Sequence, residues 1–296
     1  MSIRQCCETL GVSKSAYYKY LKRTVPDKEQ EDLELSQIIL EYDLKFNHTL
    51  GYRRMTLFIN RLNQKNYCVK KIRRLMQILG IKAKIRRTRP GYHKSTPEIT
   101  AENVLNREFK ASKPNEKWLT DVTEFKYGRK KCYLSALLDL YDRSIVGYVI
   151  GHSNNNELVF KTFDQAIQNN PNAKPMVHSD RGFQYTSKLF NVKLIKQGCT
   201  QSMSRVARCI DNGPMEGFWG IVKSEMYYLS KFEDFETLKN AIDKYIHYYN
   251  NERFQAGLKN MTPVEFRSHA WFYFLFFKPS TWQGAVHKSP VLFLSK

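Results

Sequence analysis

Three carboxylates in the second half of the chain stand where a metal ion or a substrate could meet them. Asp121 lies in a strand-like, partly apolar run, Asp180 follows a short apolar strand, and Glu216 lies in the first turn of a predicted helix. Taken singly, each is explained as an ion-pair partner, a strand-end cap or a favourable charge at a helix N-terminus. Their spacing is more informative than any one of them, because 35 residues separate Asp180 from Glu216.

Several motifs around these carboxylates agree in order and spacing with one protein family. In chain order they are TDVTE (120–124), HSDRGFQY (178–185), DNGPME (211–216), Lys223 with Glu225, YYNNER (248–253) and MTPVEF (261–266). On these motifs the chain resembles the integrase-core transposases that use an Asp, Asp, 35-residue spacing, Glu triad. It resembles in particular the second open-reading-frame product of the insertion-sequence-three family, over roughly residues 1–267.

The resemblance implies an α/β fold, in which an all-α helix-turn-helix DNA-binding region precedes a ribonuclease-H-like, mixed-sheet catalytic core. It also implies that Asp121, Asp180 and Glu216 converge as catalytic and metal-binding residues. Mg²⁺ prefers carboxylate and water oxygens, and three carboxylates can hold two ions about 3.5 to 4 Å apart. One ion would activate the attacking water or 3′-hydroxyl and the other would stabilise the leaving oxygen, with Mn²⁺ able to substitute.

We therefore expect a DDE transposase that cleaves DNA 3′ ends and joins them to other DNA, for a bacterial insertion sequence. One alternative is a catalytically inactive DNA-binding regulator derived from a transposase. Another is a metal-dependent nuclease that joins no strands. The complete triad favours activity over the first alternative, and the predicted DNA-binding region favours site-directed joining over the second.

The composition points to a polyanionic partner. The chain has 48 Lys and Arg against 28 Asp and Glu, a net charge of +20, which favours nucleic acid. The resemblance specifies terminal inverted repeats and target DNA, a homo-multimer on DNA, and an upstream frame product as fusion or partner. No apolar run is long enough to cross a membrane and no export signal is evident, so we expect a cytoplasmic, nucleoid-associated bacterial protein.

Other residues near the triad receive lesser roles. Lys223 follows Glu216 by seven residues, which returns it to nearly the same helix face, where it can reach a DNA phosphate. Glu225 competes with Glu216 but lies at a longer spacing, and His178 is explained equally well by packing. The remaining residues are assigned to packing or to ordinary strand and turn positions: Met215, Trp219, Val222, Met226, Glu124, Asp139 and Asp142.

The N-terminal region carries two helix-turn-helix patterns. Residues 1–23 form two short helices broken at 10–13, and helical patterns recur at 53–62 and 69–79. Residues 44–97 contain no Asp or Glu at all, which a merely solvated helix face explains poorly. The basic residues that we expect to contact DNA, together with Lys223, are Arg53, Arg54, Lys70, Lys71, Arg73 and Arg74.

The rest of the chain alternates between strand and helix patterns. Strands are predicted at 118–127, 132–141, 145–152, 175–178 and 200–203, and helices at 157–168, 187–197, 214–228 and 235–250. The first three strands suggest an antiparallel meander, and the later alternation suggests helices on both faces of a mixed sheet. The predicted domains are the DNA-binding region (1–84), a linker (85–115), the catalytic core (116–267) and an aromatic C-terminal tail (268–296).

Overall fold

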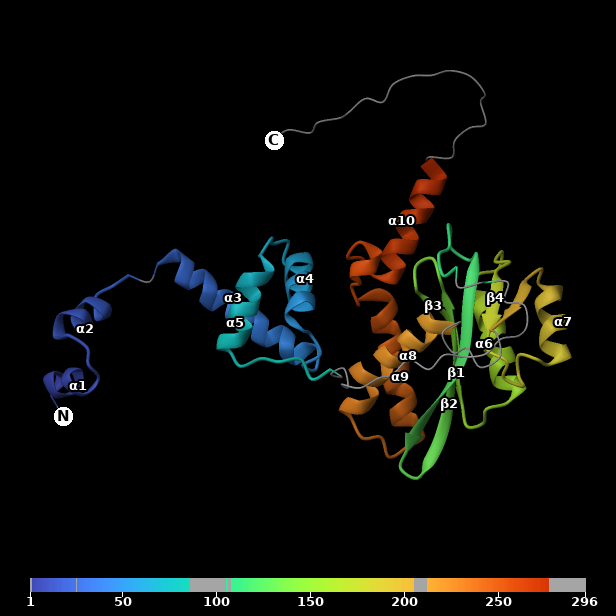
Figure 1. Ribbon diagram of the computed structural model, residues 1–296, viewed down its shortest axis with the longest axis horizontal. Coiled ribbons are helices and arrows are strands. Elements are labelled where there is room, and N and C mark those ends of the chain that lie inside the picture. The colour runs from blue at the N-terminus through green and yellow to red at the C-terminus, as the bar shows by residue number, and fades with distance from the viewer. Residues whose placement is uncertain (1, 25, 86–104, 106–107, 205–211, 277–296) are drawn as a thin grey trace, which may run out of the picture. The chain divides into compact units, whose positions relative to one another are not determined.

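A computed structural model describes residues 2–24, 26–85, 105, 108–204 and 212–276 (Figure 1). Contacts between residues divide the chain into two compact units, Met1–Thr88 and Arg89–Lys296. Within the described ranges, no helix is both long and apolar enough to span a membrane.

The described residues of the N-terminal unit form five helices. They are α1 (Ile3–Thr9), α2 (Lys14–Leu21), α3 (Asp27–Lys45), α4 (Tyr52–Leu62) and α5 (Val69–Ile78). Between α1 and α2, Gly11 adopts a left-handed φ of +65°, and the Ser13 side chain accepts a hydrogen bond from the Ala16 backbone N–H. These are the helix stop and start that the sequence predicts. The helical N-terminal region is therefore confirmed.

Helices α3, α4 and α5 share a small apolar core. Its fully or nearly fully buried side chains are Leu35, Ile39, Leu50, Met55, Phe58, Ile59, Ile72, Leu75 and Met76. In α5 the apolar residues recur at helical spacing, so one face packs and the other reaches solvent. Lys70 and Arg73 lie on the solvent side of α5.

The C-terminal unit is built on a five-stranded mixed sheet. Its strands are β1 (Lys117–Tyr127), β2 (Lys130–Asp139), β3 (Ile145–Gly151), β4 (Met176–Ser179) and β5 (Thr200–Met203). The spatial order is β3-β2-β1-β4-β5, with β1, β2 and β3 antiparallel and with β4 and β5 parallel to β1. The predicted meander and mixed sheet are confirmed.

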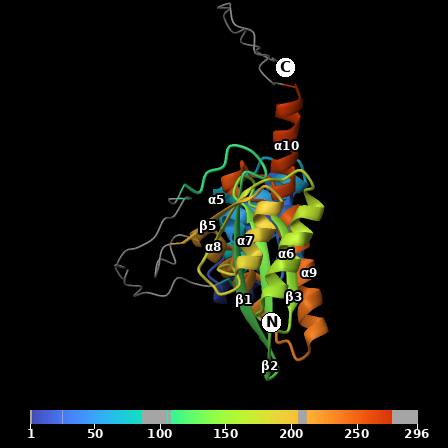
Figure 2. The ribbon, with the colours of Figure 1, turned by 90° about the vertical axis from the view of Figure 1, so that its right-hand side faces the viewer.

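Helices cover both faces of this sheet. The helices of the described part of this unit are α6 (Asn156–Asn169), α7 (Lys188–Lys196), α8 (Gly213–Glu225), α9 (Phe235–Asn251) and α10 (Pro263–Phe276), with short 3₁₀ turns at Tyr227–Leu229 and Ala256–Leu258. Helices α8 and α9 pack on one face and α6 and α7 on the other (Figures 1 and 2). Each pair of helices buries its own hydrophobic cluster against the strands.

The alternation of side chains along β1 decides which residues face which helices. Leu119 and Phe125 pack in the cluster beneath α8 and α9, whereas Trp118 packs in the cluster beneath α6 and α7. Since successive strand residues point to opposite faces, Asp121 lies on the α8 face and Thr120 on the other.

Two predicted boundaries look different in the structure. Within the predicted linker, residues 86–104, 106 and 107 lie outside the described part, but Leu105 is buried and Phe109 packs against the same core. At the other end, α10 continues through residue 267, where the sequence suggests that the core stops. Residues 277–296 of the predicted tail lie outside the described part.

Candidate active site

The register between β1 and β4 brings Asp121 and Asp180 side by side. The two strands are parallel, and Leu119 pairs with His178. Two residues further along each strand direction lie Asp121 and Asp180, and neighbouring strands are about 4.8 Å apart. The sequence predicts both strands but not that they pair. The pairing of β1 with β4 is what makes Asp121 and Asp180 neighbours.

Glu216 approaches the same place from α8. The Asn212 side chain, directly before the helix, donates a hydrogen bond to the Thr120 carbonyl oxygen at 3.2 Å. This bond fixes the start of α8 against β1, one residue before Asp121. Pro214 lies in the first turn, where its missing N–H costs nothing. Glu216 follows in the same turn and is exposed.

Asp121 is the most buried of the three carboxylates, and α8 supplies its hydrogen-bond donor. The indole Nε1 of Trp219 donates to Asp121 Oδ2 at 3.0 Å. Burial raises the pKa of Asp121 to about 6; the Trp219 hydrogen bond opposes that rise, and the nearby charges of Asp180 and Glu216 add to it. The three carboxylates therefore share one electrostatic environment.

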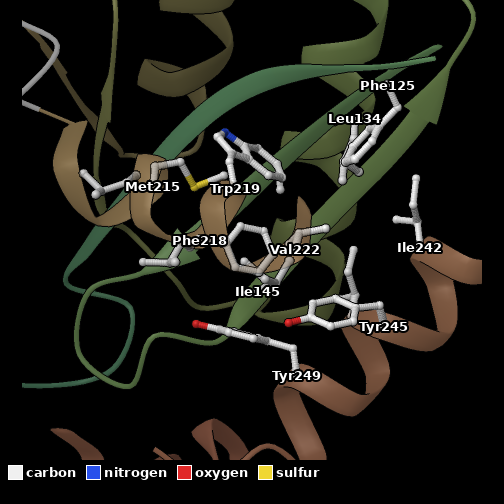
Figure 3. Packing of buried hydrophobic residues seen from close by; sticks show 14 of the residues in the cluster. Phe125, Leu134, Ile145, Met215, Phe218, Trp219, Val222, Ile242, Tyr245 and Tyr249 are labelled. Carbon is white, nitrogen blue, oxygen red and sulfur yellow. The ribbon is translucent and has the colours of Figure 1, made fainter. Parts of the chain in front are cut away.

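Trp219 is a residue of the candidate site that the sequence pattern misses. Its side chain lies in the row of apolar α8 residues between the strands and α9, as predicted (Figure 3). Its indole nitrogen, however, binds a carboxylate of the candidate site. Because a tryptophan can pack and donate at the same time, helical periodicity alone assigns it only to the core.

Asp180 lies in a tight polar turn after β4. Its Oδ1 accepts a hydrogen bond from the Gly182 N–H at 2.9 Å, and a Cβ at residue 182 would come within 3.1 Å of that oxygen. The buried Tyr185 hydroxyl lies 3.2 Å from Thr120 Oγ1, which ties the turn to β1. The motif at 178–185 thus places a carboxylate and fastens its loop to the neighbouring strand.

Lys223 lies on α8 one helical turn beyond Trp219. Its Nζ is 5.5 Å from the centre of the Phe125 ring. Burial lowers the pKa of Lys223, and the charges of Glu124 and Asp121 oppose that fall. Lys223 is therefore a basic group close enough to Asp121 to be affected by its charge.

Glu225, the competitor of Glu216, is engaged elsewhere. Its two oxygens accept hydrogen bonds from Arg253, at 2.8 and 3.0 Å, and the Tyr245 hydroxyl donates to Oε2 at 2.9 Å. Both members of the ion pair are buried. A carboxylate whose lone pairs are occupied in this way stabilises the fold.

His178, Asp139 at the end of β2 and Asp142 in the following turn also have structural partners. His178 is buried, and its ring nitrogens lie 2.8 Å from Ser202 Oγ and 3.1 Å from Ser204 Oγ. Asp139 and Asp142 are fully buried, and the Arg267 guanidinium bridges them. The sequence treats both acids as ordinary strand and turn residues, but they form a buried charge cluster that holds α10 on the sheet.

The donor set at the candidate site suits a hard divalent cation. Over the described ranges, no lysine or arginine forms an ion pair with Asp121, Asp180 or Glu216. Over the same ranges, no three His, Cys, Asp or Glu side chains lie close enough to hold one metal ion. Like-charged carboxylates repel one another without a cation between them. Their oxygens are the ligands that Mg²⁺ and Mn²⁺ take.

The basic residues expected to contact DNA fall into two groups. Lys71 Nζ lies 2.5 Å from Glu31 and 3.2 Å from Asp32 of α3, and Arg74 also pairs with Asp32. These two cations brace α5 against α3. The others that project from α4 and α5 into solvent are Arg53, Lys70 and Arg73, while Arg54 is half-buried.

One aromatic ring links two of the exposed arginines. The guanidinium carbons of Arg53 and Arg73 lie 5.7 and 5.4 Å from the centre of the Tyr52 ring. The ring therefore holds arginines from two helices on one surface.

Comparison with known families and proteins agrees with this architecture. The integrase core domain model matches residues 111–209, a second integrase core domain model matches 216–271, and an HTH-like domain model matches 29–89. The chain is 38% identical over 263 residues to the transposase InsK for insertion sequence element IS150 of Escherichia coli, covering 88% of this chain and 91% of that protein. It is 26% identical to the transposase InsF for insertion sequence IS3A of the same species, over 90% and 94% of the two chains.

Two further proteins are similar. A transposase-like protein of Haemophilus influenzae is 42% identical over 201 residues, covering 68% of this chain and 93% of that protein. The catalytic core domain of the HTLV-2 integrase matches 53% of this chain and 98% of its own, at 23% identity and a TM-score of 0.44. On the family models and the transposase relatives, the chain belongs to the DDE transposases of the insertion-sequence-three family.

Proposed function

We propose that Asp121, Asp180 and Glu216 are the catalytic and metal-binding residues of this transposase. The observation that carries the proposal is that the charges of Asp180 and Glu216 act on the buried Asp121, while no lysine or arginine of the described residues forms an ion pair with any of the three. The buried carboxylates of Glu225, Asp139 and Asp142, by contrast, each bind an arginine. A site with spare negative charge suits a cation from solution.

The reaction is cleavage at a DNA 3′ end followed by joining of that end to another phosphodiester. Two Mg²⁺ ions, or Mn²⁺ in their place, would activate the attacking oxygen and stabilise the leaving oxygen. Asp121 is oriented by Trp219, Asp180 is oriented by the Gly182 N–H, and Lys223 is placed to bind a DNA phosphate. No serine or cysteine is required as a nucleophile.

We further propose that the N-terminal unit binds the terminal inverted repeats through α4 and α5. Lys70, Arg73 and Arg53 are exposed and supply the principal phosphate or base contacts. Lys71 and Arg74 contribute less, because each already neutralises an acid of α3. Arg54 contributes through its part-exposed side. The family resemblance also supports a homo-multimer on paired DNA ends, with an upstream frame product as fusion or partner.

The direct test is a strand-transfer assay on labelled DNA that carries the element's own ends. Wild type with Mg²⁺ should give joined products that are longer or branched, and Glu216→Gln should give none while still binding DNA. Cleavage without joined products would favour the nuclease. Sequence-specific binding with no product from wild type would favour the inactive regulator.

The two groups of basic residues can be separated by salt dependence. Each phosphate contact contributes about 0.9 to the slope of log affinity against log salt on duplex DNA. Lys70→Gln with Arg73→Gln should therefore reduce that slope by nearly 2. Lys71→Gln with Arg74→Gln, the matched control, should leave the slope nearly unchanged and lower the stability of the N-terminal unit.

A further inference from the structure

An aromatic side chain stands in solvent beside Asp180. Phe183, three residues after this carboxylate, is 59% exposed. A single exposed apolar residue is common on protein surfaces and by itself means little. The feature that distinguishes Phe183 is that both of its neighbours in the chain are fixed.

The turn that carries Phe183 is held by a dense set of hydrogen bonds. The Gly182 carbonyl oxygen accepts from the N–H groups of Tyr185 and Thr186, at 3.0 and 3.1 Å, while its own N–H donates to Asp180. On the other side of Phe183, the Gln184 side chain is buried and donates to Asn154. The backbone of residue 183 is therefore anchored while its ring faces outward.

The position of this ring follows from the length of the chain. Three residues span at most about 11 Å when fully extended, and the turn shortens this distance. A DNA strand whose phosphate lies at Asp180 therefore passes within about 11 Å of the backbone of residue 183. Aromatic side chains stack on nucleobases, and this contact tolerates any sequence because every base has a π-face. A ring on a fixed backbone also loses little entropy when it binds.

We propose that Phe183 stacks on a nucleobase of the DNA held at the Asp121, Asp180 and Glu216 site. This inference rests on the proposed function, since it requires that DNA is processed there. The base could come from the target or from the transposon end, and the two sources predict different losses. A base of target DNA would be contacted during joining only, whereas a base of the transposon end would be contacted during cleavage as well.

The test uses the full chain and four variants: Phe183→Ala, Phe183→Leu, Phe183→Tyr and, as a matched control, Leu189→Ala. Leu189, on the following helix α7, is a somewhat more exposed apolar residue, at 68% against 59% for Phe183. Two rates are measured with Mg²⁺: 3′-end cleavage without target, and joining to a target plasmid whose insertion sites are then sequenced. Thermal unfolding should show all four variants folded, because neither side chain is buried.

Loss of stacking should slow the affected step by about tenfold. For a target base, Phe183→Ala and Phe183→Leu slow joining only and change the base preference beside the insertion site. For a base of the transposon end, the same variants slow both steps and leave the insertion sites unchanged. In either case Phe183→Tyr and Leu189→Ala behave like wild type.

Three results would overturn the proposal. The first is an unchanged rate and insertion pattern in Phe183→Ala. The second is full activity in Phe183→Leu together with a loss of activity in Phe183→Ala. An apolar contact with protein or sugar would then account for the role of Phe183 without base stacking. The third is a wild type that gives no metal-dependent DNA product, which would overturn the proposed function and this inference together.

Discussion

Two carboxylate clusters on the same sheet are built on opposite principles. At the end of β2 and in the turn that follows, Asp139 and Asp142 are fully buried and Arg267 bridges them. At the junction of β1 and β4, Asp121 is largely buried beside Asp180 and Glu216, and its hydrogen-bond donor is the neutral Trp219. The first cluster is neutralised by the protein. In the second, burial raises the pKa of Asp121 and the charges of Asp180 and Glu216 add to that rise, while no lysine or arginine of the described residues pairs with the three carboxylates, so a cation from solution can neutralise them.

Structural acids and the proposed catalytic acids of this fold differ in one property. Burial alone does not distinguish them, because Asp139 and Glu225 are more buried than Glu216. The presence of an internal arginine does distinguish them. Replacing a carboxylate should therefore have opposite effects on stability in the two clusters.

The largest effect should come from removing a carboxylate of the unneutralised cluster. Asp180→Asn should lower the rate of strand transfer by at least about 10³-fold, because a lost metal ligand removes several kcal/mol of transition-state stabilisation. Asp180 is exposed, so the unfolding midpoint in urea should hardly change. A variant that keeps more than a tenth of wild-type activity would place the reaction elsewhere.

In the neutralised cluster of Asp139, Asp142 and Arg267, a substitution should lower the stability of the protein. Arg267→Met leaves two buried carboxylates without their cation, which should cost about 3 to 5 kcal/mol of unfolding free energy at pH 7. Because burial and mutual repulsion raise the pKa of Asp139, protonation should restore part of that loss near pH 5. Urea denaturation at both pH values measures the difference. A pH-independent loss would show that packing, not charge, dominates at Arg267.

Asp121→Asn should have the opposite effect on stability: it should raise the unfolding free energy of the metal-free protein. The folded pKa of Asp121 is about 6, above the value of about 3.9 in an unfolded chain. Folding therefore favours the protonated form: its stabilising contribution is complete below about pH 4 and is lost as the pH rises through about 6. At pH 7.5 the variant should gain roughly 2 to 3 kcal/mol, and the gain should vanish near pH 4.

Chemical denaturation in the presence of a chelator measures this gain. Destabilisation of Asp121→Asn at pH 7.5 would contradict the account, because it would mean that the charge is already compensated within the protein.

The smallest effect should follow loss of a single donor. Trp219→Phe keeps the apolar packing but removes the hydrogen bond to Asp121, and it should lower activity by about 10- to 100-fold. The matched control is Tyr245→Phe, which removes one hydrogen bond to the structural Glu225. This control should cost about 1 kcal/mol of stability and leave the rate unchanged. Equal effects of the two variants on the rate would argue against a positioning role for Trp219.

Most of the secondary structure could be predicted from the sequence alone, whereas the grouping of the three carboxylates could not. The strands and most helices were predicted within a few residues of their bounds, because β-branched runs, apolar periodicity and caps such as Ser13 are local signals. The triad itself needed the family resemblance. Spacing alone does not say that Asp121 and Asp180 are neighbours, which depends on the pairing of β1 with β4.

The remaining features depend on contacts between residues far apart in the sequence. Arg267 reaches Asp139 across 128 positions, and Trp219 reaches Asp121 across 98. Similarly, Lys71 and Arg74 carry the same sequence signal as Lys70 and Arg73, and only the packing of α3 shows that acids neutralise the first pair. Helix α10 was not predicted, since its aromatic run lacks a polar face.

The most direct test of the central claim is calorimetric titration of Mn²⁺ into the protein at pH 7.5. We predict that wild type binds the ion, that Asp121→Asn and Glu216→Gln each weaken or abolish binding, and that Glu124→Gln binds as wild type does. Glu124 is a fair control, because it lies on β1 only three residues from Asp121 and pairs with Lys131. Undiminished Mn²⁺ binding in Asp121→Asn and Glu216→Gln would contradict the claim that the unneutralised carboxylates form the metal site.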